Sequence, residues 1–201
     1  MKIGIVNYGM GNIQSIIGAI EYIGNYKTVY TNDNDQLLSC DKLILPGVGA
    51  FDKAMNNIKT YNLDHTINEF VKTKPILGIC LGMQIMSSIG YENGTTQGLN
   101  LVEGETVKLN LSKSKIPHIG FNQVRFQKNS RLFNEVPNYS DFYFTHSFHF
   151  VSNENLDLSY CDYEGEFVCG FEKKNISGVQ FHPELSQKYG LRLLKNFIDI
   201  F

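Results

Sequence analysis

Two short motifs, far apart in the sequence, contain the residue types of a nucleophilic catalyst. The first is Gly78-Ile79-Cys80-Leu81-Gly82, which places a thiol between glycines after the apolar run 75–79. The second is His182-Pro183-Glu184, which follows the apolar run 176–181. A thiol nucleophile needs an imidazole that takes its proton and returns one to a leaving amine, and a carboxylate that orients the imidazole. We therefore expect Cys80, His182 and Glu184 to form a catalytic triad.

The cysteine motif is typical of a nucleophile elbow, the sharp strand-to-helix turn that lifts a nucleophile above a sheet. The flanking glycines allow such a turn. A helix that begins at Leu81 or Gly82 would direct backbone amides at the sulfur and favour the thiolate. In the second motif, a strand that carries His182 would place Glu184 on the same face, and Pro183 would end that strand.

A loop at residues 45–51 could complete such a site. It reads Leu45-Pro46-Gly47-Val48-Gly49-Ala50-Phe51 and follows a predicted buried strand. Attack on a carbonyl creates a tetrahedral oxyanion, which needs two hydrogen-bond donors. We expect these donors to be the amide of Leu81 and one amide from Val48 or Gly49, with a plain tight turn as the alternative.

Each feature also has an ordinary structural explanation. A cysteine after an apolar strand is often a small core residue, and His-Pro-Glu alone is commonly a turn. The loop at residues 8–12 lacks the third glycine of a dinucleotide motif, so it predicts either a turn with Asn12 as a helix N-cap or a site-lining segment. Both catalytic motifs, however, follow predicted strands of an α/β chain, and ligands bind at the carboxyl ends of such strands.

The pattern of apolar residues predicts an α/β fold. In the first half, strands alternate with helices, which indicates a mostly parallel sheet flanked by helices. The predicted strands cover 3–7, 28–30, 42–45 and 75–79, and the predicted helices cover 12–23, 51–72 and the segment from 81. After Gly90 the pattern changes to short β segments at 106–109, 122–126, 142–145, 148–151, 167–171 and 176–181, followed by a helix at 187–201. This half predicts an antiparallel or mixed sheet.

Composition limits the classes of function. A chain of 201 residues with 42% hydrophobic content is enough for one sizeable core, so we expect one domain over 1–201. The net charge of −2 and interspersed charges predict neither nucleic-acid nor membrane binding, and favour a small-molecule substrate. With no signal peptide expected and no Cys-x-x-Cys spacing, the four cysteines indicate a reducing cytoplasm. His146 and His149 lack a nearby thiol pair, so we expect no metal, and we expect no cofactor.

Six motifs spread over nearly the whole chain resemble one known family. They are Tyr8-Gly9-Met10-Gly11-Asn12, Leu45-Pro46-Gly47-Val48-Gly49, Gly78-Ile79-Cys80-Leu81-Gly82-Met83-Gln84, Pro117-His118-Ile119-Gly120-Phe121-Asn122, Tyr143-Phe144-Thr145-His146-Ser147 and Gly178-Val179-Gln180-Phe181-His182-Pro183-Glu184. Together they resemble the class I, triad-type glutamine amidotransferases, and within them the glutaminase subunits of imidazole glycerol phosphate synthase.

The resemblance implies a class I glutamine amidotransferase-like fold and hydrolysis of glutamine through a thioester on Cys80. It further implies that Gln84 and Glu92 hold the amino and carboxylate ends of glutamine. Gly47 and the backbone of His146 and Ser147 would add further contacts to the substrate.

The resemblance also implies a heterodimer with a (β/α)8-barrel cyclase that receives the ammonia for histidine biosynthesis. In such a pair, docking would activate the glutaminase by flipping a peptide within Pro46–Gly49. Three positions depart from the family pattern, all near the docking side. Asn7 replaces a usual acid, Phe121 a usual Trp and Leu185 a usual Lys.

Those departures leave three alternatives open. The chain could be a paralogue that supplies ammonia, through a related barrel, for amidation of a surface-glycan sugar. It could be a binding module that has lost turnover. It could also be a cysteine hydrolase of another amide, such as a γ-glutamyl peptide, in which case it would be active without a partner.

Overall fold

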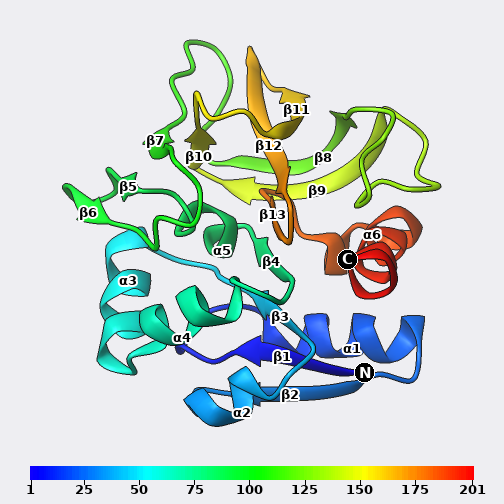
Figure 1. Cartoon of the computed structure of the whole chain (residues 1–201). Coiled ribbons are helices and arrows are strands. Elements are labelled where there is room, and N and C mark those ends of the chain that lie inside the picture. Colours follow the sequence, from blue (N-terminus) through cyan, green and yellow to red (C-terminus); the bar gives the residue numbers. More distant parts are fainter.

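The structure is a computed structural model that describes residues 1–201 (Figure 1). The first half contains β1 (Lys2–Val6), α1 (Ile13–Ile23), β2 (Lys27–Thr31), α2 (Asn34–Leu38), β3 (Lys42–Leu45), α3 (Phe51–Thr60), α4 (Leu63–Phe70), β4 (Ile76–Ile79) and α5 (Leu81–Gln84). The rest contains β5 (Ile89–Gly90), β6 (Thr96–Gln97), β7 (Glu105–Lys108), β8 (His118–Arg125), β9 (Ser140–His146), β10 (Phe148–Val151), β11 (Asp157–Asp162), β12 (Glu166–Lys173), β13 (Ile176–Val179), the 3-10 helix η1 (Pro183–Leu185) and α6 (Gln187–Ile200).

All strands belong to one mixed sheet. Its parallel part has the order β2-β1-β3-β4-β13. Strand β13 then pairs antiparallel with β12, and the sheet continues through β10, β7, β5 and β6. A branch from β12 leads through β11 and β8 to β9. The predicted α/β class, with a parallel centre and a mixed second segment, is therefore confirmed.

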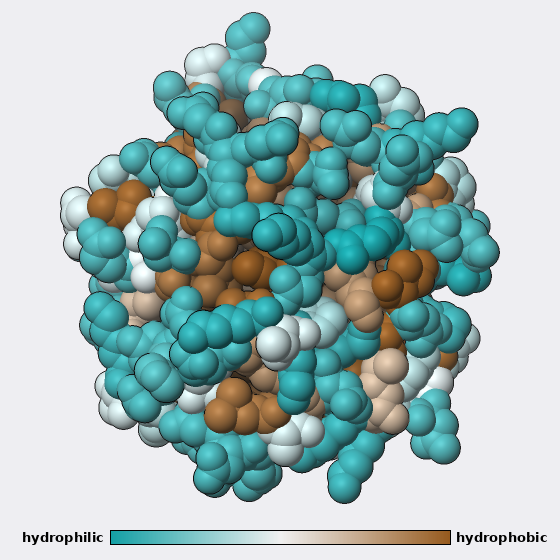
Figure 2. Space-filling model, in the orientation of Figure 1, coloured by the Kyte–Doolittle hydropathy of each residue, from teal (hydrophilic) through white to brown (hydrophobic).

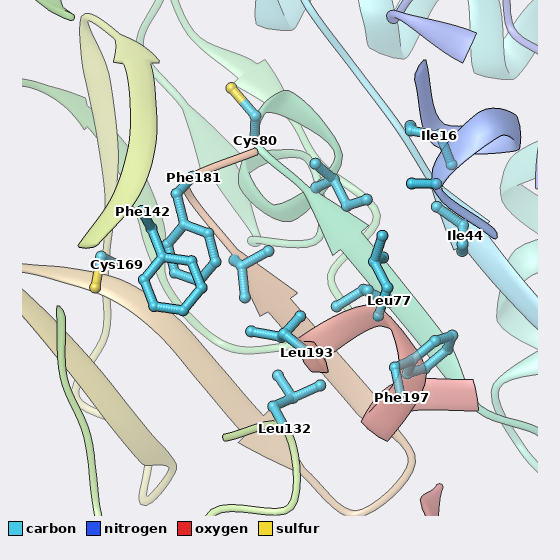
Figure 3. Packing of buried hydrophobic residues seen from close by; sticks show 14 of the residues in the cluster. Ile16, Ile44, Leu77, Cys80, Leu132, Phe142, Cys169, Phe181, Leu193 and Phe197 are labelled. Atoms are coloured by element: carbon cyan, nitrogen blue, oxygen red, sulfur yellow. The ribbon is translucent and has the colours of Figure 1, made fainter. Parts of the chain in front are cut away.

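Helices cover both faces of the parallel strands. Ile44 and Leu77 pack in one apolar cluster with residues of α1 and α6, whereas Leu45 and Ile76 pack in a second cluster with residues of α3 and α4. Figure 1 shows the two helix layers, and Figure 3 shows Ile44, Leu77 and Phe197 within the first cluster. Burial on both faces explains why these strands are continuous apolar runs in the sequence.

The register of three parallel strands brings distant segments to one edge of the sheet. Val179 of β13 lies beside Ile79 of β4, and Leu45 of β3 lies beside Gly78 of β4. The carboxyl ends of these strands are therefore level. The residues that follow them, which include the loop 46–49, Cys80 and the segment 180–184, consequently meet at that edge.

Several elements differ from the sequence-based prediction. The helix after the cysteine motif is only four residues long, because the carbonyls of Ile85 and Met86 accept hydrogen bonds from backbone amides of the segment 99–102 instead of continuing the helix. The helices predicted over 51–72 are α3 and α4, and the break between them lies at Asn62, whose φ of 55° is left-handed. The short elements α2, β5, β6 and β11 were not predicted, and β8 begins at His118 rather than at residue 122.

Polar residues dominate the molecular face drawn in Figure 2, where hydrophobic residues lie mainly in recesses between them. None of the helices has both the length and the apolar character that crossing a bilayer requires.

Candidate active site

Cys80 lies at a strained turn between β4 and α5. Its φ and ψ are 54° and −111°, a conformation that is costly for a residue with a side chain and that is typical of a nucleophile elbow. Gly82, at the start of α5, has no room for a side chain. A Cβ atom on Gly82 would lie 1.8 Å from the carbonyl oxygen of Leu45. The elbow therefore packs directly against the end of β3.

The Cys80 sulfur points away from the apolar core. Figure 3 shows it at the edge of the cluster, directed away from the rings of Phe142 and Phe181. The side-chain Nε2 of Gln180 lies 3.6 Å from the sulfur, and the carbonyl oxygen of Thr145 lies 3.9 Å from it. The thiol is thus nearly buried in a polar surrounding, which distinguishes it from an ordinary core cysteine.

His182 and Glu184 lie together, but not on a strand. Strand β13 ends at Val179, and His182 extends beyond it, with its backbone N–H donating to the carbonyl of Tyr143 at 2.9 Å. Pro183 then begins the 3-10 turn η1. This turn brings Oε1 of Glu184 to 2.8 Å from Nδ1 of His182. The expectation that both side chains share one strand face is wrong, because Pro183 forces the chain to turn before Glu184.

The charge state of His182 is set by its neighbours. Burial alone favours the neutral imidazole, but the interactions with the Cys80 sulfur and the Glu184 carboxylate outweigh it and raise the pKa of His182 to about 10. The ring is therefore an imidazolium at neutral pH. An imidazolium beside the sulfur is the arrangement in which cysteine enzymes hold a thiolate.

This raised pKa predicts a loss of stability at high pH. His182 is charged up to about pH 10 in the folded chain, but only up to its ordinary pKa of 6.5 in the unfolded chain. Its stabilising contribution is therefore complete below that lower value and disappears as the pH rises through about 10. Urea unfolding should show this loss, on the order of 3 kcal/mol between about pH 6 and about pH 10.5. His182→Gln should lose clearly less over the same range, and equal losses in both proteins would contradict the assigned charge.

A cavity of about 210 Å³ opens beside Cys80. Eight residues expected at the site line it, namely Val48, Gly49, Cys80, Leu81, Gln84, Glu92, His146 and Ser147. Three lining residues were not predicted, namely Pro117, Thr145 and Phe148. His182 and Glu184 are not among the lining residues.

Gly47 does not line the cavity, contrary to its expected substrate contact. A Cβ atom at this position would lie 2.4 Å from the hydroxyl of Tyr8 and 2.8 Å from Cβ of Leu81. The residue is therefore packed beneath the loop. The Tyr8 hydroxyl donates a hydrogen bond to the carbonyl of Pro46. Burial, followed by the proximity of Cys80, raises the pKa of Tyr8, so this hydroxyl remains a donor.

Val48, Gly49 and Leu81, the expected sources of the oxyanion donors, all line the cavity. Val48 is 47% exposed, and Gly49 has a φ of +128°, a region in which other residues are strained. The glycine therefore lets the peptides between β3 and α3 turn in a way that a residue with a side chain would resist.

The side chains of Gln84 and Glu92 each use one polar atom in hydrogen bonds to other parts of the protein. Nε2 of Gln84 donates to the carbonyl of Phe148 at 2.8 Å and to Oε1 of Gln180 at 3.0 Å, so its own Oε1 is the group left for the cavity. Oε2 of Glu92 accepts from the backbone N–H of Phe51, at the start of α3, at 2.9 Å. Both side chains are thereby held in the wall.

Both ring nitrogens of the His146 side chain have partners within the protein. Its Nδ1 lies 2.8 Å from the carbonyl of Phe148, and its Nε2 lies 3.0 Å from Nδ1 of His118. Burial lowers the pKa of His146 to about 3 and that of His118 to about 4, so both rings are neutral. This pair was not predicted, because the strand pairing that joins β8 to β9 is not visible in the local sequence.

The loop at residues 8–12 lies next to the loop 46–49, which is expected to supply an oxyanion donor. Gly9, Met10 and Gly11 share a surface depression with Val48 and Gly49. Asn12 occupies the N-cap position of α1, but its side chain makes no capping hydrogen bond. The segment is therefore a turn that also borders the site.

The comparisons with known proteins agree with this geometry. A family model described as glutamine amidotransferase class-I matches residues 4–200. A solved structure described as a glutamine amidotransferase has a TM-score of 0.77 at 14% identity, covering 98% of this chain and 96% of that chain. The chain belongs to the class I glutamine amidotransferase family, and it is an enzyme of that family.

Two similar proteins within this family carry the name of one particular subunit. The protein of Campylobacter jejuni (strain RM1221) named imidazole glycerol phosphate synthase subunit HisH 1 is 44% identical, over 98% of this chain and all of its own length. The protein of Pelagibacter ubique (strain HTCC1062) named imidazole glycerol phosphate synthase subunit HisH is 39% identical, over the full length of both.

Proposed function

We propose that this protein is the glutaminase subunit of an imidazole glycerol phosphate synthase and that residues 1–201 act as one glutaminase domain. The observation that carries the proposal is the position of the Cys80 sulfur at a strained elbow, beside a His182 ring that Glu184 holds at 2.8 Å. The full-length similarity to proteins named HisH supports this function over sugar amidation.

The reaction begins with attack of the Cys80 thiolate on the side-chain carbonyl carbon of glutamine. The resulting oxyanion accepts hydrogen bonds from the amide of Leu81 and from one amide of Val48 or Gly49. His182 then donates its proton to the amide nitrogen, the carbon–nitrogen bond breaks, and ammonia leaves a thioester on Cys80. Glu184 keeps the imidazole oriented throughout.

Hydrolysis of the thioester completes the cycle. The neutral His182 takes a proton from water, and the hydroxide adds to the thioester carbonyl. The carbon–sulfur bond then breaks, the thiolate is restored and glutamate leaves. Gln84 and Glu92 both line the cavity and offer acceptor oxygens, namely Oε1 of Gln84 and the free carboxylate oxygen of Glu92. Both therefore suit the α-ammonium group of glutamine, and neither supplies a donor for its carboxylate. His146 and Ser147 contribute backbone groups from the opposite wall.

Ammonia is mostly protonated at neutral pH and is then no nucleophile, so it must pass directly to a synthase. The partner in this proposal is a (β/α)8-barrel cyclase in a heterodimer, in the cytoplasm. Exposed apolar side chains support a docking surface beside the site, with Ile119 60%, Phe121 50% and Leu185 39% exposed. The reduced state of all four cysteines fits that compartment.

Docking would also control the activity. The loop 46–49 carries an oxyanion donor and is tied down by the Tyr8 hydroxyl at Pro46. An outward-pointing peptide in this loop would leave Cys80 without its second donor until the partner flips it.

Glutamine hydrolysis by the purified chain tests the function. It should be weak for the chain alone and rise strongly with the barrel cyclase of the same genome and its ribulose-phosphate intermediate. Stimulation only by a second barrel paralogue would assign the chain to sugar amidation instead. Full activity without any partner would indicate an independent cysteine hydrolase, and none under any condition would indicate a binding module.

A further inference from the structure

Gln180 is a buried polar residue that makes direct contact with the candidate nucleophile. Its side chain has no solvent exposure, and its Nε2 lies 3.6 Å from the Cys80 sulfur. Its backbone N–H donates to the carbonyl of Cys169 at 2.9 Å, so the strand pairing of β13 with β12 fixes its position. None of the roles assigned so far uses this side chain.

The hydrogen-bond partners decide which end of the Gln180 amide faces the sulfur. The carbonyl of Phe148 can only accept, so Nε2 of Gln84 and Nδ1 of His146, both 2.8 Å from it, must donate. Because Gln84 Nε2 is a donor, the Gln180 atom 3.0 Å from it is the oxygen. The nitrogen of the Gln180 amide must then face Cys80.

The same carbonyl also fixes the two histidines. His146 is neutral and donates through Nδ1, so its Nε2 accepts a hydrogen bond from Nδ1 of His118. The hydrogen bonds from His118 through His146, and separately from Gln84, therefore converge on the Phe148 carbonyl oxygen. The amide orientation of Gln180 follows from the Gln84 branch.

We propose that Gln180 is a further catalytic residue, whose side-chain N–H donates a hydrogen bond to the Cys80 sulfur and stabilises it as a thiolate. The inference rests on the proposed glutaminase function, because it assigns a role in the same nucleophile's chemistry. Donors favour the charged form of an acceptor. The bond is therefore strongest in the free enzyme and when thioester hydrolysis restores the thiolate, and weakest in the neutral thioester.

Alkylation of the cysteine tests this role without using glutamine. The rate of reaction with iodoacetamide is measured over a range of pH for the full chain and for Gln180→Met and Gln180→Glu. Met fills a similar volume without a donor. Glu keeps the acceptor toward Gln84, removes the donor toward the sulfur and, when ionised, adds a negative charge beside it. Near neutral pH Gln180→Met should react about 10- to 100-fold more slowly, the factor that a hydrogen bond to a charged group supplies, and Gln180→Glu at least as slowly. The rates should converge with wild type at high pH, where Cys80 is ionised in all three proteins.

Two controls accompany the measurement. Cys80→Ala measures background alkylation, which should be low, since burial raises the pKa of each of the other three thiols. Ser177→Ala removes a buried hydroxyl from β13, the strand that precedes Gln180, and should leave the pH profile unchanged. Ultraviolet absorbance of the thiolate gives an independent readout.

Unchanged alkylation profiles in both Gln180 variants would overturn the role of Gln180. If the profiles shift but no partner elicits glutamine hydrolysis, Gln180 would be retained and the glutaminase function would be wrong. The two failures are thus distinguishable.

Discussion

Cys80→Ala is expected to abolish glutamine hydrolysis in the assembled complex while leaving the use of free ammonium salts by the partner synthase intact. Removal of the nucleophile leaves no atom that can form the thioester, so turnover should fall by at least about 10⁴-fold. The fold should survive, because the sulfur lies at the edge of the core and points away from it. Ammonia release from glutamine and product formation from ammonium are measured side by side.

Cys161→Ala provides the matched control. This cysteine is also buried, but it lies on β11, away from the cavity. Its loss should lower stability by about 1 kcal/mol and leave glutamine turnover unchanged. Turnover that persists in Cys80→Ala would show that another group is the nucleophile.

Gly82→Ala is expected to destabilise the fold strongly. The added Cβ would lie 1.8 Å from the Leu45 carbonyl oxygen, and backbone atoms of β3 cannot yield without disturbing the parallel sheet. We expect destabilisation by about 3 kcal/mol or more, together with loss of activity. Urea unfolding measures the first effect, and glutamine hydrolysis in the complex measures the second.

Gly18→Ala makes the same chemical change with the opposite expected result. Gly18 lies on the exposed face of α1, and a Cβ there meets nothing within 4 Å. Alanine should stabilise the helix by about 1 kcal/mol through its higher helix propensity. If both substitutions changed the unfolding free energy equally, the close approach of the elbow to β3 would be wrong.

Local sequence patterns were sufficient for the strands of the parallel half of the fold, although they missed the short helix α2. The apolar runs at 42–45 and 76–79 are buried on both faces, so length and composition identify them as strands. The elements that were missed are stabilised by contacts between distant segments. Strand β5 is two residues long, and α5 ends early because its following carbonyls bind the segment 99–102. Neither feature has a local signal.

The residues of the candidate site also divide into those that local motifs predict and those whose positions depend on contacts between distant segments. Cys80 lies in one short motif, and His182 and Glu184 lie in another. Each motif forms a single local turn, so all three residues could be predicted from the sequence. Gln180 lies two residues before His182, yet its contact with the sulfur depends on the pairing of β13 with both β4 and β12. The position of Gly47 outside the cavity wall has a related cause, because it depends on the packing of Tyr8 against the loop, which the local sequence does not show.

The position of β13 has a consequence for how the protein becomes active during synthesis. Cys80 follows β4, whereas His182 and Glu184 follow β13, the strand that inserts beside β4 after all the others have been made. A ribosome-bound chain therefore carries the thiol long before it carries the base, and it cannot release ammonia from glutamine until residues through 184 have emerged and paired. Such long-range pairing also slows folding. Ammonia production therefore begins only in molecules in which β13 has already paired with β4.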